Sequence, residues 1–241
     1  MAPSLIAYFP LADAAVPTDL LDLYVGAGVD TVEFGWPARD PYLDGADVRA
    51  SMARAASGDP YAALTAARER LASHRTAPKA LIMTYAEPHH PALRDPDFFR
   101  GVDATLIVGP PDGACRSAME SRARKAATGI SVFLPLPLAA DDIAAATQAD
   151  CYAMLQAAPG LTGPRTSLDV DNKARVTELR TRGVTAPIVL GFGISSGAQA
   201  RLAVDFGADG VVVGSAILRA ALQGRRELEA LLTQFRESLD A

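Results

Sequence analysis

The sequence predicts an α/β protein built as a single (β/α)8 barrel, or TIM barrel, over residues 1–241. Two observations carry this prediction. Eight short apolar segments each precede a segment with helical character, and no shift in composition marks a linker between them. Strict alternation of strand and helix indicates parallel strands joined by right-handed crossovers. Eight such units in 241 residues are typical of this barrel.

The expected strands are 4–11, 29–36, 80–85, 105–109, 130–134, 151–156, 187–190 and 210–213. Helices are expected over about 16–27, 47–57, 60–75, 96–100, 112–128, from 140, then 169–182, 197–206, 215–222 and 227–239. Asp59 has the character of an N-cap, and Pro60 suits the first helical position.

A Gly-x-Asp pattern provides a third observation. It stands before the second, fourth and eighth expected strands, and Gln148-Ala149-Asp150 is a weaker copy before the sixth; the full copies begin at Gly28, Gly101 and Gly207. A repeat on alternate strands suits a barrel, whose interior layers come from alternate strands, better than a doubly wound open sheet. The alternative is that the pattern only ends helices wherever a helix precedes a strand.

Composition limits the classes of function. The net charge is −5, 49% of residues are hydrophobic and 21% are charged, with no basic tract. We therefore expect neither nucleic acid nor a membrane surface as a partner. No signal-peptide pattern and no apolar run of about 18 residues is found, and Cys115 and Cys151 fit no metal or redox spacing. These features predict a cytoplasmic protein with reduced thiols.

Two carboxylates are the candidate catalytic groups. Glu33 lies in the apolar run 29–36, near the end of the second strand, and Asp44 follows in a loop rich in proline and glycine. Residues at the carboxyl ends of barrel strands face the active site. We expect burial to raise the pKa of Glu33 and Asp44 to remain ionised on its loop, which suits proton transfer. The alternative is that Glu33 is a structural acceptor.

Glycine-rich loops follow the last two expected strands. They are Gly191-Phe192-Gly193-Ile194-Ser195-Ser196-Gly197 and Gly214-Ser215. Barrels commonly bind phosphate at these two places, where backbone N–H groups and a helix N-terminus favour an anion. A long loop at 159–166 is a candidate lid over the barrel mouth, the alternative being a merely long connection.

Other chemistries are disfavoured. A Schiff base needs a lysine at the barrel mouth, but Lys79 enters the bottom of a strand, and Lys125 and Lys173 fall on helices. We expect no metal and no cofactor, because the histidines do not form a ligand set and are interpreted as surface residues: His74, His89 and His90. Acid–base chemistry on a phosphorylated substrate remains.

The segment Val32-Glu33-Phe34-Gly35-Trp36-Pro37, with Asp40-Pro41 and Asp44-Gly45, resembles the Glu-Leu-Gly-Ile-Pro-Phe-Ser-Asp-Pro-Leu-Ala-Asp-Gly motif of the tryptophan synthase alpha subunit family. Further blocks resemble this family in the same order: 160–163, 191–195 and 214–217. The resemblance covers essentially the whole chain.

The resemblance implies a lyase that cleaves indole-3-glycerol phosphate to indole and glyceraldehyde 3-phosphate. Glu33 would be the general acid and base, and Asp44 would stabilise charge at the indole nitrogen. The remaining implied site residues are Phe192, Gly193, Gly214 and Ser215 around the phosphate, Thr162 and Gly163 in the closing loop, and Tyr8 and Tyr85 in the pocket wall. The implied partner is a beta subunit that contains pyridoxal phosphate and consumes indole.

The chain differs from the family pattern at several positions: Ala38, Arg39, Tyr42, Leu43, Gly109, Met154 and Ala158. Changes on the loops that face a beta subunit favour, as an alternative, a stand-alone lyase of secondary metabolism. A regulatory homologue that only binds the phosphate ligand is a second alternative, and the retained carboxylates disfavour it. Asp44 and the predicted lid disfavour another phosphate-binding barrel enzyme, such as an isomerase.

Overall fold

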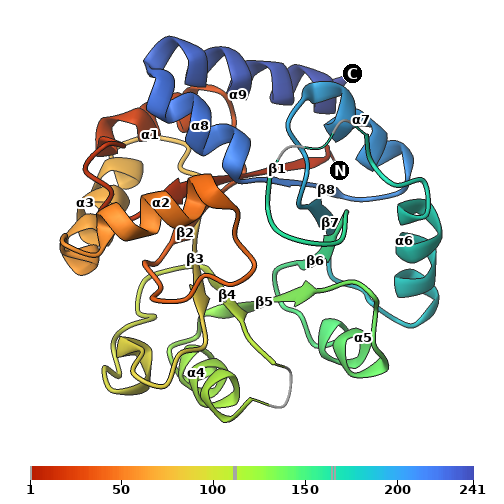
Figure 1. The fold of residues 1–241 in the computed structure, drawn as a ribbon, viewed down its shortest axis with the longest axis horizontal. Coiled ribbons are helices and arrows are strands. Elements are labelled where there is room, and N and C mark those ends of the chain that lie inside the picture. The colour runs from red at the N-terminus through yellow and green to blue at the C-terminus, as the bar shows by residue number, and fades with distance from the viewer. Residues whose placement is uncertain (1, 111–112, 164, 166) are drawn as a thin grey trace.

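The computed structural model describes residues 2–110, 113–163, 165 and 167–241, and within them eight parallel strands close into a barrel in chain order (Figure 1). The strands are β1 (Ser4–Pro10), β2 (Thr31–Gly35), β3 (Lys79–Tyr85), β4 (Ala104–Val108), β5 (Gly129–Leu134), β6 (Ala153–Gln156), β7 (Ile188–Gly191) and β8 (Gly210–Val213). Because β1 pairs with β8 as well as β2, the prediction of a barrel is confirmed and the open sheet is excluded.

Helices surround the barrel (Figure 1). They are α1 (Leu21–Gly26), α2 (Ala46–Ala55), α3 (Pro60–Ala72), α4 (Ala114–Lys125), α5 (Ala140–Ala146), α6 (Asn172–Thr181), α7 (Gly197–Asp205), α8 (Ser215–Gln223) and α9 (Arg225–Asp240), with short 3-10 turns at η1 (Thr18–Leu20) and η2 (Pro91–Leu93). As expected, Pro60 begins α3, and the Asp59 side chain accepts hydrogen bonds from the Tyr61 and Ala62 amides. In the part of the chain that the structure describes, no helix is long and apolar enough to cross a membrane.

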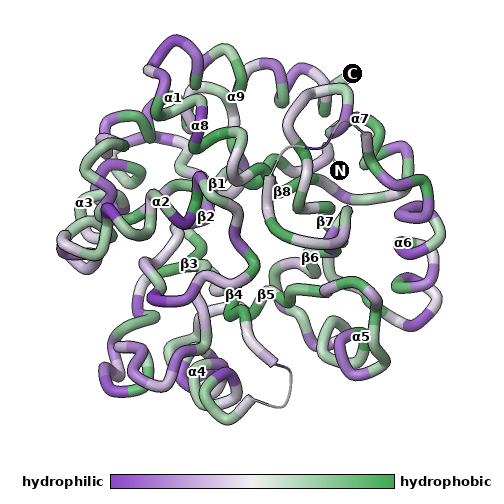
Figure 2. Tube along the Cα trace, viewed as in Figure 1, coloured by the Kyte–Doolittle hydropathy of each residue, from purple (hydrophilic) through white to green (hydrophobic). Residues whose placement is uncertain are grey.

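The core lies in two shells, inside the barrel and between the barrel and its helices. Every residue of β2, β4, β6, β7 and β8 is buried, as expected of parallel strands covered on both faces. Figure 2 shows apolar residues concentrated on the strands and polar residues on the outer turns of the helices. The longest helix, α9, buries one stripe with helical spacing, formed by Leu228, Leu232, Phe235 and Leu239.

The Gly-x-Asp repeat has a structural role at the amino ends of the strands. Each aspartate carboxylate accepts a hydrogen bond of 2.7–3.0 Å from a backbone amide on the preceding odd-numbered strand, in the pairs Asp30–Leu5, Asp103–Ala80, Asp150–Ile130 and Asp209–Ile188. The amide of each aspartate donates in return to the carbonyl of the same residue. The repeat does follow the ends of helices, but its aspartates also hydrogen-bond neighbouring strands to each other at the bottom of the barrel.

One predicted helix is absent. Residues 96–100 form successive turns, and the local 3-10 turn lies earlier, at Pro91–Leu93. The Asp95 carboxylate accepts from the Asp97 amide, and the Arg100 amide bonds to the carbonyl of Asp97, three residues earlier. These local bonds compete with helix formation. Other boundaries differ from the prediction by a few residues, and Asp112, the expected start of one helix, lies outside the described residues.

Candidate active site

Glu33 lies inside the barrel near the end of β2. Its side chain is buried, and the Tyr152 hydroxyl donates a hydrogen bond of 2.9 Å to Glu33 Oε2. The pKa of Glu33 is raised to about 7, mainly by burial. The hydrogen bond from Tyr152 favours ionisation and opposes this shift, whereas the charge of Asp44 adds to it. A carboxyl group with this pKa can both donate and accept a proton near neutral pH.

Asp44 belongs to the loop between β2 and α2, yet it is only 4% exposed. The Tyr85 hydroxyl donates to Oδ2 at 2.7 Å, and the Thr162 hydroxyl donates to Oδ1 at 3.1 Å. Burial raises the pKa of Asp44, while the bonds from Tyr85 and Thr162 oppose this shift. That Asp44 stays ionised remains a prediction, which the two hydrogen bonds support and burial opposes; the structure adds that the loop folds into the mouth and buries the carboxylate.

The predicted lid packs against the loop that carries Asp44. The Gly45 amide donates to the Thr162 hydroxyl at 2.8 Å, and the Thr162 amide donates to the Leu43 carbonyl at 3.0 Å. A side chain at Gly45 would overlap the Thr162 carbonyl, so the close approach of the two loops requires glycine there. Pro164 and Thr166, which belong to the predicted lid, lie outside the described residues.

The glycine-rich loops lie at the ends of the last two strands. Phe192 and Gly193 have positive φ angles of 71° and 93°, and a phenylalanine held in this region is strained. Gly214 directly precedes α8, whose first residue is Ser215. The helix N-terminus and the glycine backbone therefore meet the cavity where an anion is favoured.

One cavity unites all the residues that the sequence proposed. Its wall includes Glu33, Asp44, Tyr8, Tyr85, Thr162, Gly163, Phe192, Gly193, Gly214 and Ser215. Apolar residues complete the wall: Leu43, Val48, Met83, Val108, Phe133, Met154, Ile194 and Val212. The rings of Phe133 and Phe192 stack with centroids 5.2 Å apart and an interplanar angle of 26°. The cavity thus combines an apolar compartment with two carboxylates and an end formed by the glycine-rich loops.

Sequence reasoning missed Tyr152 and Phe133. Tyr152 immediately precedes β6 and its hydroxyl reaches Glu33; Phe133 lies on β5 and stacks on Phe192. Alternation along 151–156 places Tyr152 on the same side as Met154, which faces the cavity. That signal was present in the sequence, but the partner of Tyr152 depends on the register across the barrel.

The histidines do not behave alike. His89 is exposed, as expected, but His90 is buried, so its interpretation as a surface residue was wrong. Its Nε2 lies 2.8 Å from the Thr84 hydroxyl, its Nδ1 accepts from the Ala92 amide, and Phe98 packs against the ring. Burial lowers the pKa of His90 to about 4. Among the described residues, no cluster of three potential ligands could hold a metal.

The fold and the cavity together define a class, a (β/α)8 barrel with two buried carboxylates and two glycine-rich loops around one cavity at its mouth. Comparison with known proteins narrows this class. The model of the family described as "Tryptophan synthase alpha chain" matches residues 2–240. The chain belongs to the tryptophan synthase alpha chain family.

Curated relatives and solved structures agree with this membership. The tryptophan synthase alpha chain of a Picosynechococcus strain is 33% identical, over 98% of this chain and 92% of the relative. That of Leifsonia xyli is 34% identical, over 92% of this chain and 87% of the relative. A structure of Mycobacterium tuberculosis tryptophan synthase covers 100% of this chain and 93% of its own chain with a TM-score of 0.85; at 22% identity it supports the fold alone.

Proposed function

We propose that this protein cleaves indole-3-glycerol phosphate to indole and glyceraldehyde 3-phosphate, the lyase activity implied by its family. The observation that carries the proposal is the position of Glu33, buried with a pKa of about 7 in the same cavity as Asp44 and the glycine-rich loops. A ring substrate with a phosphorylated chain matches this arrangement, because the apolar wall suits the ring and the loops suit the phosphate.

Cleavage requires one proton to move from the substrate's chain to its ring. Glu33 donates a proton to ring carbon C3, which makes the ring an electron sink for the carbon–carbon bond. The carboxylate then removes the proton of the adjacent chain hydroxyl, so that the bond breaks, an aldehyde forms and the ring leaves as indole. Glu33 ends in its original state, and a pKa near the working pH suits both steps.

Asp44 assists by accepting a hydrogen bond from the indole N–H, where positive charge develops after ring protonation. Tyr85 and Thr162 hold its two oxygens, so the carboxylate is oriented before the substrate binds. Gly193, Gly214 and Ser215 bind the phosphate through backbone amides and the α8 N-terminus, with Phe192 beside them. Thr162 and Gly163 close the cavity over the substrate.

We further propose a tryptophan synthase beta subunit as the partner, because membership of the alpha chain family implies one. The loop between β2 and α2, which carries Arg39 and Tyr42, differs from the family pattern, and the alternative is a lyase that works alone.

Both proposals are tested by measuring indole release from indole-3-glycerol phosphate by the purified protein, alone and with a beta subunit and serine. Release that rises strongly with the beta subunit supports a coupled alpha chain. Equal, brisk release in both samples supports the stand-alone lyase. No indole in either sample would contradict the proposed substrate.

A further inference from the structure

Tyr8 brings a buried hydroxyl group into the candidate active site. Tyr8 lies on β1, and its Cα pairs in register with that of Glu33 on β2. Its side chain is 3% exposed and lines the same cavity as Glu33 and Asp44. Among the described residues, none forms a hydrogen bond with the Tyr8 hydroxyl.

Three other buried tyrosines show that this is unusual in the molecule. The hydroxyls of Tyr24, Tyr85 and Tyr152 donate to the Tyr8 carbonyl, Asp44 and Glu33, at 2.7–2.9 Å. A buried polar group without a partner is unfavourable and calls for an explanation in a folded protein. The position of the Tyr8 hydroxyl in a ligand cavity provides this explanation, since a bound ligand can supply the missing partner.

The Tyr8 ring is fixed in place. It lies across Gly35 at the end of β2, where even a methyl group would overlap the ring and its hydroxyl. The Tyr24 hydroxyl donates a hydrogen bond of 2.8 Å to the Tyr8 carbonyl, and this bond fixes the backbone of Tyr8. Burial and the nearby Asp44 and Glu33 keep the pKa of Tyr8 well above its ordinary value, so the hydroxyl keeps its proton and can donate.

The proposed substrate has three polar parts, and two already have partners. Asp44 accepts from the indole N–H, and the glycine-rich loops bind the phosphate. The hydroxyl groups of the glycerol chain remain. The ionised Glu33 carboxylate can accept from the hydroxyl beside the ring but cannot donate, so the hydroxyl oxygens still have no protein donor.

We propose that the Tyr8 hydroxyl donates a hydrogen bond to a hydroxyl oxygen of the glycerol chain, which makes Tyr8 a specificity residue for a phosphorylated diol chain. This inference rests on the proposed function. Tyr8 would select the hydroxylated chain over an otherwise identical chain without hydroxyls, since only the former satisfies its buried O–H.

The test compares two ligands in the Glu33→Gln variant, in which turnover should be slower by about 10²- to 10⁴-fold, with and without Tyr8→Phe. The ligands are indole-3-glycerol phosphate and its deoxy analogue 3-(indol-3-yl)propyl phosphate, and calorimetry gives each affinity. We expect Tyr8→Phe to weaken binding of the diol by about 2- to 13-fold, the value of one hydrogen bond, and to change binding of the deoxy analogue by less than about twofold. We expect the thermal midpoint of the Tyr8→Phe variant to stay the same or rise, because the substitution removes an unpaired buried hydroxyl.

Thr105→Val is the matched control, since it also removes one buried hydroxyl, but one that donates to the Ile82 carbonyl, away from the cavity wall. It should lower the thermal midpoint and leave the ratio of the two affinities unchanged. If Tyr8→Phe weakens both ligands equally, or neither, the inference is overturned while the proposed function stands. If neither ligand binds even with Tyr8 intact, the proposed function itself is contradicted.

Discussion

Glu33 illustrates at the scale of one residue how a property useful for catalysis opposes stability. Its carboxyl group is buried and has one hydroxyl donor, Tyr152, so ionisation inside the barrel is unfavourable. The pKa rises from the ordinary value of 4.5 to about 7. Folding therefore favours the protonated form, while the proposed reaction uses both forms.

This shift predicts how stability changes with pH. Because the pKa of Glu33 is raised in the folded state, protonated Glu33 contributes to the free energy of unfolding. This contribution is fully present below pH 4.5 and is lost as pH rises through about 7. Glu33→Gln removes this loss, so we expect the variant to be more stable than the wild type at pH 8, by on the order of 3 kcal/mol, and equally stable near pH 4. Urea unfolding at the two pH values measures the difference.

A constant difference between the variant and the wild type across this pH range would contradict the raised pKa. The sequence supported only the direction of this shift, from one acid within an apolar strand. It did not support the burial of Asp44, because a loop rich in proline and glycine is usually exposed. The cover over Asp44 comes from Thr162, 118 residues later.

At the scale of elements, two loops assemble the mouth of the cavity. The Thr162 hydroxyl donates to Asp44 and accepts from the Gly45 amide, so one side chain joins the long loop after β6 to the loop after β2. Thr162→Ala removes both bonds. We expect kcat/KM for indole release to fall by about 10- to 100-fold, because Asp44 loses a donor and the loops separate.

Thr162→Ser keeps the hydroxyl and is the matched control, with kcat/KM expected within about threefold of the wild type. Equal losses in the alanine and serine variants would show that the methyl group matters and that the two hydrogen bonds do not.

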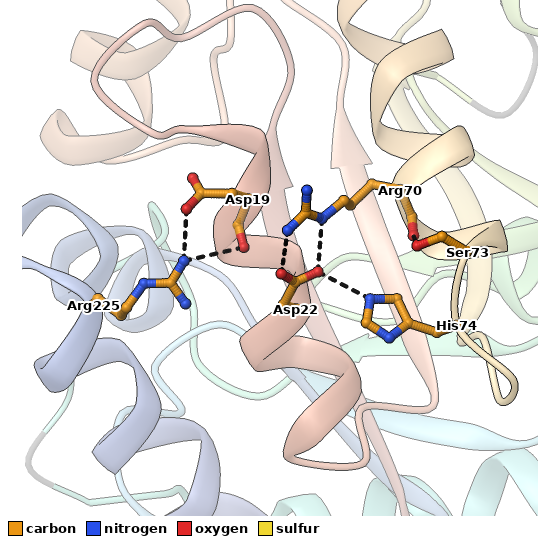
Figure 3. A network of polar contacts seen from close by, with 6 residues as sticks. All are labelled: Asp19, Asp22, Arg70, Ser73, His74 and Arg225. Atoms are coloured by element: carbon orange, nitrogen blue, oxygen red, sulfur yellow. Dashed lines mark hydrogen bonds and ion pairs between the residues drawn. The ribbon is translucent and has the colours of Figure 1, made fainter.

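A second pair of elements is joined by charge outside the barrel. Figure 3 shows Asp22 of α1 facing Arg70 of α3 and the nearby His74. Arg70 Nε lies 2.7 Å and His74 Nε2 lies 2.9 Å from Asp22 Oδ1. The bond from Arg70, followed by that from His74, holds the pKa of Asp22 well below its usual range.

A lowered pKa gives the opposite dependence on pH from that of Glu33. Ionised Asp22 contributes to the free energy of unfolding. This contribution is present above the unfolded-state pKa of 3.8 and is lost as pH falls through the lower pKa of the folded state. We expect Asp22→Asn to lower the thermal midpoint by about 1–3 °C at pH 7, a small effect because the pair is partly exposed. The difference should shrink at low pH; an equal shift at pH 7 and in strong acid would contradict this account.

Sequence patterns predicted the elements better than their ends. The eight strands follow from buried apolar runs, whereas residues 96–100 resembled a helix and instead form turns. Turns are favoured over a helix in that segment by the hydrogen bond to the Asp95 carboxylate and by the burial of Phe98 and Phe99. Such contacts depend on packing against Trp36, which a linear pattern does not reveal.

At the scale of the whole molecule, barrel closure is what creates the site. Pairing of β1 with β8 brings Tyr8 and Gly214 to one cavity, although the two residues are separated by most of the chain. The aspartates of the Gly-x-Asp repeat fasten the opposite end of the barrel. The sequence predicted Glu33, Asp44 and the glycine-rich loops because they follow strands in a fixed order. The family resemblance implied the rest, such as Tyr8 and Tyr85, whereas Tyr152 required the register between strands.

In the proposed function, Glu33 is the acid and base that releases indole. The most direct test is the rate of indole release from indole-3-glycerol phosphate by the wild type, Glu33→Gln and Glu87→Gln. Glu87 is the matched control, because it lies outside the cavity wall and its oxygen accepts from the Arg39 and Asp40 amides, which glutamine can also do. We expect the rate to fall by about 10²- to 10⁴-fold in Glu33→Gln and to change little in Glu87→Gln. Indole release by Glu33→Gln at the rate of the wild type would contradict it.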